Sequence, residues 1–143
     1  MPASLSAWQQ FARFAVVGLA NTVAGFAVIV AATVILGLHD VAANALGYAV
    51  GLAIGFAANR RWTFAHRGRL APAIARFLLA FAASWLANLL TLLALRHGLG
   101  LPPLPSQALA IVPYTLTFFV LSRSFVFRIP ARPAPALHPP SRS

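Results

Sequence analysis

Asn59-Arg60-Arg61-Trp62-Thr63-Phe64 (NRRWTF) is the stretch from which the rest of the chain is best interpreted. An apolar run ends there, and two guanidinium groups and two large aromatic side chains follow directly. Arginine is enriched in cytoplasmic loops of membrane proteins, and aromatic side chains gather at the membrane interface. The stretch therefore predicts the cytoplasmic end of a transmembrane helix. A weaker copy, Ser122-Arg123-Ser124-Phe125-Val126-Phe127, follows 63 positions later.

The composition of the whole chain indicates a membrane protein. Of its 143 residues, 60% are hydrophobic and 8% are charged, whereas a soluble domain is about 25% charged. Such a chain cannot cover its own surface in water. The net charge of +10 could indicate a nucleic-acid partner, but the arginines lie between apolar segments instead of lining one face, so no nucleic-acid partner is predicted.

Four apolar segments are long enough to cross a bilayer, which takes about 20 helical residues. They are predicted at about residues 14–38, 41–59, 77–95 and 106–122. The first is too long for the apolar part of a signal peptide, and other spans follow it, so no cleavage is expected. The predicted fold class is an all-α membrane protein with one domain over residues 1–128. The Pro/Arg-rich residues 129–143 are predicted to form a disordered cytoplasmic tail.

The distribution of arginine predicts the orientation of the chain. Ten of the 11 arginines lie in the N-terminal lead, in the loop between the second and third spans, or near and within the tail, and only Arg96 lies in another connector. Loops rich in Lys and Arg stay in the cytoplasm. Both termini are therefore predicted to be cytoplasmic, in a multi-pass protein. The many alanines, and arginine in place of lysine, suggest a GC-rich bacterial genome, so the membrane is predicted to be the bacterial inner membrane.

An offset of 63 positions relates the two halves of the chain. It pairs Arg13 with Arg76, Phe56 with Phe119, Arg60 with Arg123, and Phe64 with Phe127. Chance matches among apolar residues are the alternative, but two arginine pairs aligned at one offset favour a duplication. Each unit holds an even number of spans, so its copies have the same orientation. The prediction is two parallel two-helix repeats.

Four motifs follow one another along the chain: Phe11-x-Arg13-Phe14-x-x-Val17-Gly18-x-x-Asn21-Thr22, Ala43-Asn44-x-x-Gly47-Tyr48, Phe56-x-x-Asn59-Arg60-Arg61-Trp62-Thr63-Phe64 and Ser122-Arg123-x-Phe125-Val126-Phe127. In this order they resemble the GtrA-like family, over about residues 8–128. The resemblance implies a small four-helix membrane protein of bacterial cell-surface polysaccharide synthesis. It also implies the flipping of a polyprenyl-phosphate-linked sugar across the cytoplasmic membrane. Two features depart from the pattern: Ser122 stands at the position equivalent to Asn59 in the second repeat, and the Pro/Arg tail has no counterpart in the pattern.

Several side chains could hold the phosphate of such a lipid. Arginine binds phosphate through two parallel donors and stays charged. The candidate headgroup contacts lie near the cytoplasmic ends of the predicted spans: Arg13, Asn59, Arg60, Arg76 and Arg123. The simpler interpretation of each arginine is an anchor to ordinary lipid phosphates. Arg61, Arg67 and Arg69 are interpreted as plain positive charge of a cytoplasmic loop.

Polar side chains inside or near the spans need partners, so they face protein or a wet cavity. The candidates for a sugar path, or for hydrogen bonds within the bundle, are Asn21, Thr22, Asn44, Ser84 and Asn88. Both interpretations stay open. Gly47, Gly51 and Gly55 form a GxxxGxxxG stripe, which predicts close packing against another helix of the same chain or of a second copy.

The scarcity of acidic and thiol groups limits the chemistry of the chain. Asp40 is its only acid, and it has no cysteine. Metal-dependent glycosyl transfer, nucleophilic hydrolysis and proton-coupled export all need groups that are missing. We therefore expect no enzyme activity, no cofactor and no metal site. The expected partners are a polyprenyl-phosphate-linked sugar, membrane lipids, and a second protomer or a glycosyltransferase. The rival hypothesis is a non-transporting membrane adaptor or anchor subunit for a polysaccharide-synthesis enzyme.

Overall fold

The computed structural model describes residues 5–128, which form four long helices and, over that range, no strand. The helices are α1 (Ala7–Val34), α2 (Asp40–Ala58), α3 (Leu70–Leu93) and α4 (Pro103–Leu121). The last three continue into five-residue π-helical turns: η1 (Asn59–Thr63), η2 (Ala94–Gly98) and η3 (Ser122–Val126). All four helices are long and apolar enough to cross a membrane, which confirms the predicted fold class. The predicted tail at 129–143 lies outside the described residues.

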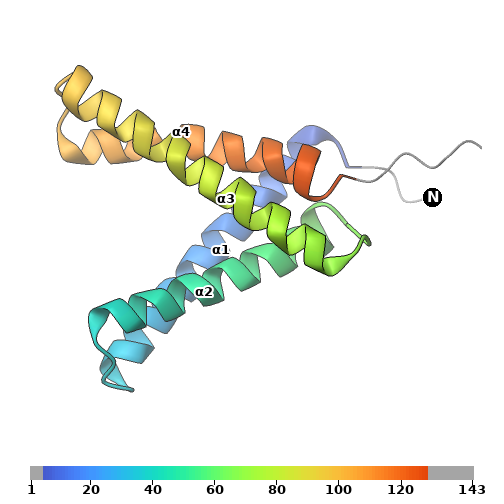
Figure 1. Ribbon diagram of the computed structural model, residues 1–143, viewed down its shortest axis with the longest axis horizontal. Coiled ribbons are helices and arrows are strands. Elements are labelled where there is room, and N and C mark those ends of the chain that lie inside the picture. Colours follow the sequence, from blue (N-terminus) through green and yellow to red (C-terminus); the bar gives the residue numbers. More distant parts are fainter. Residues whose placement is uncertain (1–4, 129–143) are drawn as a thin grey trace, which may run out of the picture.

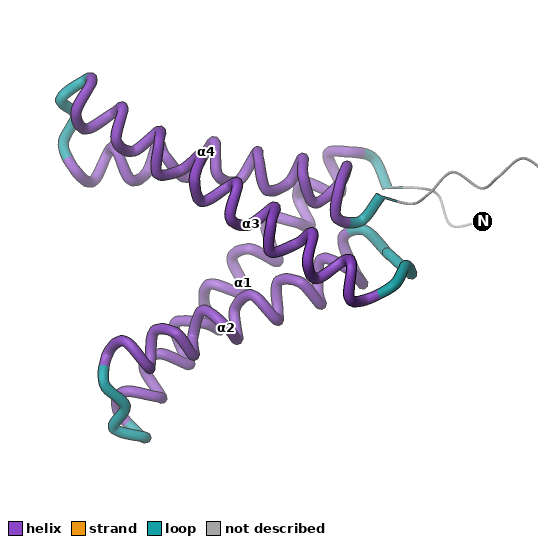
Figure 2. The backbone as a smooth tube through the Cα atoms, viewed as in Figure 1, coloured by secondary structure: helices purple, strands orange, loops and turns teal. Residues whose placement is uncertain are grey.

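The helices form two hairpins that meet at one end and diverge toward the other, as the two arms of a V (Figure 1). α1 packs on α2, and α3 packs on α4. Figure 2 shows both interhelical connectors of the hairpins at the far tips of the arms. Because α1 and α3 both begin at the vertex, the two hairpins run in the same direction.

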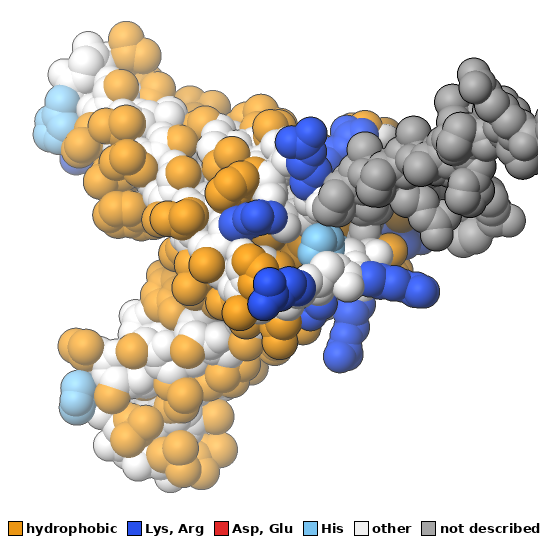
Figure 3. Space-filling model, turned by 45° about the vertical axis from the view of Figure 1, so that its right-hand side comes forward, with side chains coloured by type: hydrophobic (Ala, Val, Ile, Leu, Met, Phe, Trp, Pro, Cys, Tyr) orange, Lys and Arg blue, Asp and Glu red, His pale blue; other side chains and the backbone are white. Residues whose placement is uncertain are grey.

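We call the vertex the arginine end. Figure 3 shows most of the basic side chains gathered there, whereas hydrophobic side chains cover both arms. Eight of the arginines within residues 5–128 lie at or near this end: Arg13, Arg60, Arg61, Arg67, Arg69, Arg76, Arg123 and Arg128. The positive-inside rule predicts that this end faces the cytoplasm.

The first helix is displaced toward the arginine end relative to the predicted span. It begins at Ala7 instead of Phe14 because Ser6 forms a capping box, in which Ser6 Oγ accepts from the Gln9 N–H at 3.2 Å and Gln9 Oε1 accepts from the Ser6 N–H at 2.9 Å. It ends at Val34, before the predicted limit, because Gly37 adopts a left-handed φ of 64°.

The offset of 63 positions recurs in the bounds of the elements. Corresponding elements of the two hairpins begin at residues 63 positions apart: α1 and α3 at Ala7 and Leu70, α2 and α4 at Asp40 and Pro103, and η1 and η3 at Asn59 and Ser122. The left-handed glycines that follow the first helix of each hairpin, Gly37 and Gly100, have the same spacing. The matching bounds support the duplication. Orientation in a membrane stays a prediction.

An aromatic cluster at the arginine end holds the hairpins together. Its buried phenylalanines come from three helices and from the residues that follow η1 and η3: Phe14, Phe64, Phe77, Phe118, Phe119 and Phe127. The ring of Phe14 meets those of Phe118 and Phe119 edge-on, with centroids 5.5 and 5.6 Å apart. Each such pair contributes about 0.5–1.5 kcal/mol beyond the area it buries. This cluster forms the core of the molecule.

Glycines allow α1 and α2 to approach closely within one chain. A Cβ added at Gly47 would lie 2.6 Å from the carbonyl oxygen of Gly25, and a Cβ at Gly55 would lie 2.6 Å from Asn21 Nδ2. Gly51 also faces α1. The glycine stripe of α2 is therefore occupied by the other helix of its own hairpin, which resolves the two alternatives left by the sequence.

Candidate functional site

Arg13 and Arg76, near the starts of α1 and α3, each lie over an aromatic ring at the end of their own hairpin. The Arg13 guanidinium carbon is 5.1 Å from the centre of the Trp62 ring, and Arg13 Nη1 donates to the Trp62 carbonyl at 2.9 Å. Arg76 lies 5.7 Å from the centre of the Phe125 ring. The two pairs are 63 positions apart. Both arginines thus tie the entry of a hairpin to its exit.

Asn59 supports the backbone of η1 instead of facing the surface. Its side chain is 3% exposed, and its Oδ1 accepts from Thr63 Oγ1 at 2.9 Å. Ser122, the equivalent residue of the second hairpin, is also fully buried. The structure therefore buries the Asn59 side chain within the turn that carries Arg60.

Arg60 and Arg61 line a groove between the end of α2 and the start of α3. The groove has a volume of about 450 Å³. Arg60 is half-buried and its Nη2 donates to the Gly68 carbonyl at 2.7 Å, so the loop after η1 orients the guanidinium. Arg61 is exposed, and its place in the groove revises the interpretation of plain loop charge. Arg123 does not line this groove.

The remaining wall of this groove is apolar. Eight of the ten lining residues are aliphatic or aromatic: Leu52, Ala53, Phe56, Ala57, Leu70, Ile74, Phe77 and Leu78. Leu52 lies nine positions before Arg61 on a helical segment, so the groove extends about 13 Å along α2. It presents two cations at the arginine end and apolar surface beyond them.

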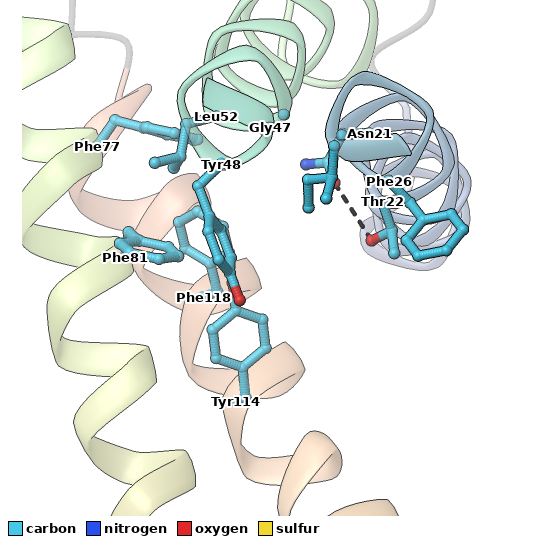
Figure 4. A pocket seen from close by; sticks show the side chains of 13 residues that line it. Asn21, Thr22, Phe26, Gly47, Tyr48, Leu52, Phe77, Phe81, Tyr114 and Phe118 are labelled. Atoms are coloured by element: carbon cyan, nitrogen blue, oxygen red, sulfur yellow. Dashed lines mark hydrogen bonds between the residues drawn. The ribbon is translucent and has the colours of Figure 1, made fainter. Parts of the chain in front are cut away.

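A cavity of about 280 Å³ lies between the two hairpins. Asn21 and Thr22 of α1 face it from one side, and Tyr48 of α2 and Tyr114 of α4 point toward one another across it (Figure 4). Thr22 Oγ1 donates to the Gly18 carbonyl at 2.9 Å and lies 3.4 Å from Asn21 Oδ1. Amides and hydroxyls of this kind can exchange hydrogen bonds with a polar ligand.

The other polar candidates lie elsewhere. Ser84 is buried and donates to the Ala80 carbonyl at 2.7 Å, within its own helix. Asn88 Nδ2 donates to the Ala110 carbonyl at 2.8 Å and so links α3 to α4. Asn44 is exposed on α2. For Ser84 and Asn88 the structure favours hydrogen bonding within the bundle over a sugar path.

Residues 13–127 match the family model of the GtrA/DPMS transmembrane domain. The chain belongs to the GtrA/DPMS transmembrane family. No curated protein and no solved structure matches it. The family assignment confirms the resemblance found in the sequence and relates the chain to glycosyl-lipid and polysaccharide synthesis. With its four membrane-spanning helices, the chain is a multi-pass membrane protein.

Leu52 and Phe77 line both the groove and the cavity of this GtrA/DPMS domain. Phe77 is 3% exposed, and its ring centroid lies 5.2 Å from that of Phe56 and 5.1 Å from that of Phe118. The two spaces therefore share one apolar partition. Sequence reasoning missed this pair because apolar side chains inside spans carry no signal of a cavity wall.

Two tyrosines were also missed by the sequence analysis. Tyr48 belongs to one of the motifs that resemble the family, which was the available signal. Tyr114 follows Pro113 in α4 and occupies the position 63 after Gly51. A large side chain that replaces a glycine of the first repeat marks a place where the two hairpins cannot pack alike.

Proposed function

We propose that this chain moves a polyprenyl-phosphate-linked sugar across the bacterial cytoplasmic membrane for cell-surface polysaccharide synthesis, with its arginine end and both termini in the cytoplasm. The observation that carries the proposal is the groove with two arginines that shares a partition with a polar-lined cavity. Such a lipid needs cations for its phosphate, apolar surface for its chain and hydrogen-bonding groups for its sugar. The two spaces offer all three.

The cations suit a phosphate because they follow the end of α2, which is long and apolar enough to span the bilayer, so that lipid phosphates would come within their reach. One N–H of Arg60 donates to the Gly68 carbonyl, so the side chain is already partly ordered and loses less conformational entropy when a ligand binds. Arginine–phosphate bonds are charge-assisted and roughly twice as strong as neutral hydrogen bonds. For the lipid to be released on the far side, its phosphate has to leave these arginines and cross together with the sugar.

The cavity suits a sugar because both polar and apolar side chains line it. Inside hydrocarbon, an unpaired hydroxyl costs several kcal/mol. Asn21, Tyr48 and Tyr114 supply amide and phenol groups, while the surrounding glycines and phenylalanines leave room for a ring. For a sugar to pass from the groove to the cavity, the side chains of Leu52 and Phe77 have to move aside.

The test is a translocation assay with the purified full chain in liposomes, using a short-chain polyprenyl phosphate that carries a radiolabelled hexose. Movement is measured as the label that becomes accessible to an impermeant oxidant. We expect Leu52→Trp to lower the rate more than about tenfold, because it enlarges the partition. Leu46→Trp is the control, since Leu46 is exposed on the same helix and lines neither space.

The same question can be asked in cells that lack the protein. Translocation predicts that the sugar donor accumulates facing the cytoplasm while the external glycan loses that sugar. A donor that is never made, or that is already exposed outside, contradicts the proposal.

The second candidate is a membrane adaptor that recruits a polysaccharide-synthesis enzyme. The observation that favours it is the exposed loop that carries Arg67 and Arg69. Replacement of both by alanine does not remove the Gly68 carbonyl, which can still accept the hydrogen bond from Arg60. The adaptor hypothesis predicts that this double variant loses the glycan, whereas the transport hypothesis predicts that it keeps it.

A further inference from the structure

The repeat offset relates the groove between α2 and α3 to a second place, between the end of α4 and the start of α1. Position for position, Arg60 corresponds to Arg123 and Arg61 to Ser124. In the wall, Phe56 corresponds to Phe119, and Ile74 corresponds to Phe11 of the first repeat. The two places can therefore be compared as two versions of one site.

The second place is closed by aromatic side chains. The ring of Phe11 stands at 84° to that of Phe119 with the centroids 5.2 Å apart, and Trp8 stacks on Phe11 at 5.8 Å. α1 and α4 are in contact there. At the groove, Ile74 stands where Phe11 does, so Phe56 meets no aromatic ring from that position. The Phe56 ring packs on Phe77, 5.2 Å away, as Phe119 packs on Phe14. The α2–α3 version has an open volume of about 450 Å³.

The charges differ in the same sense. The groove holds two arginines, whereas the closed place has Arg123 and a serine whose Oγ donates to the Val120 carbonyl at 2.6 Å. Asp40, the only acid of the chain, is at the start of α2 and so at the opposite end of the molecule. Within residues 5–128, no carboxylate neutralises Arg60 and Arg61. Two neighbouring cations without an acid favour an anionic ligand.

We propose that the phosphate of the polyprenyl carrier binds in the α2–α3 groove, on Arg60 and Arg61, and does not bind at the repeat-related place. The proposal rests on the proposed function and names where its substrate binds. A volume of about 450 Å³ lies in the range of small-molecule sites, about 300–1,000 Å³. It has room for the phosphate and the first part of the chain, which runs along Leu52 and Ile74 toward the middle of the bilayer.

Gly68 is a positioning residue for this site. Its carbonyl accepts from Arg60 Nη2 at 2.7 Å, and a Cβ at Gly68 would contact the His66 ring. That ring lies 5.6 Å from Phe127, against the aromatic cluster. Gly68→Ala therefore forces either the His66 ring or the loop that carries this carbonyl to shift, without removing a charge. We expect it to weaken carrier binding about threefold and to leave the binding of other anionic lipids unchanged.

The direct test measures binding of short-chain polyprenyl phosphate to the full chain by native mass spectrometry. Arg60→Gln/Arg61→Gln should weaken binding about tenfold or more, because charge-assisted bonds to phosphate are lost. Arg123→Gln is the matched control from the other repeat and should change the affinity less than about twofold. An equal loss in both variants overturns the proposal, as does an unchanged affinity in the double variant.

Two controls accompany this binding measurement, one for lipid specificity and one for folding. Phosphatidylglycerol, added at the same mole fraction, should not displace the carrier, and equal competition would make the groove a general anchor for anionic lipids. If the glutamine variant does not fold by circular dichroism, Arg60→Lys/Arg61→Lys replaces it, and a loss of about threefold is expected because lysine keeps the charge without the bidentate geometry.

Binding and transport fail separately. If the wild type binds the carrier in this groove and moves none of it, the site is correct and the proposed function is wrong. If the wild type moves the carrier and the glutamine or lysine variant binds and moves it equally well, the site is wrong and the function stands.

Discussion

The two hairpins follow one plan but join their helices by different chemistry. In the first, α1 and α2 meet where the backbones of Gly25 and Gly47 touch. In the second, 63 positions later, Asn88 donates a hydrogen bond to the Ala110 carbonyl. The helices of the two hairpins thus contact each other at equivalent positions, through close backbone packing in the first hairpin and through a side-chain hydrogen bond in the second. The difference teaches that the repeat fixes where helices cross, whereas the contact itself is free to change.

The largest effect is expected where the first hairpin has no spare room. In Gly47→Ala, the new Cβ would lie 2.6 Å from the Gly25 carbonyl oxygen, and such overpacking costs about 1–3 kcal/mol. Unfolding in mixed micelles should show this loss. Gly18→Ala is the control, because nothing lies within 4 Å of its added Cβ. A Gly47→Ala protein as stable as the wild type would show that the glycine contact is dispensable.

A smaller difference is expected between the two arginine–aromatic pairs. Arg13→Ala removes both a contact with the Trp62 ring and a hydrogen bond to its carbonyl, so a loss of about 1–2 kcal/mol is expected. Arg76→Ala removes a contact with the Phe125 ring and should cost about 0.5 kcal/mol. Equal losses in the same unfolding assay would mean that the carbonyl bond adds nothing.

The smallest effect concerns the closed counterpart of the groove. Phe11→Ile together with Ser124→Arg gives it the residues of the open groove at these two positions. We expect a second carrier to bind, several-fold more weakly than the first because Trp8, which stacks on Phe11, stands where the repeat of the open groove has Ala71. Native mass spectrometry counts bound carriers per chain. A count that stays at one would show that the closure depends on more than the Phe11 ring.

The four spans could be predicted from the sequence because helices satisfy every backbone polar group in lipid and so leave long apolar runs. The start of α1 was missed because its first turns hold polar residues, Gln9 and Gln10, and the start of α3 was missed because Arg76 interrupts an apolar run that begins at Leu70. The bond between Asn59 and Thr63 could have been found, since residues four apart share a helix face. The groove could not, because its volume depends on how the side chains of α2 and α3 pack, just as the closure of its counterpart depends on whether Phe11 reaches Phe119.

The π turns bear on how such a chain arose. Fewer than about 1% of residues in proteins lie in π-helices, yet η1 and η3 occupy matching positions in the two hairpins. If the two halves arose by duplication, the π turn was already present in a single-hairpin ancestor before two genes were fused. A homodimer of such hairpins would hold two identical clefts, and neither could change without the other. Fusion removed this constraint, and one half became free to specialise as the structural partner of the other.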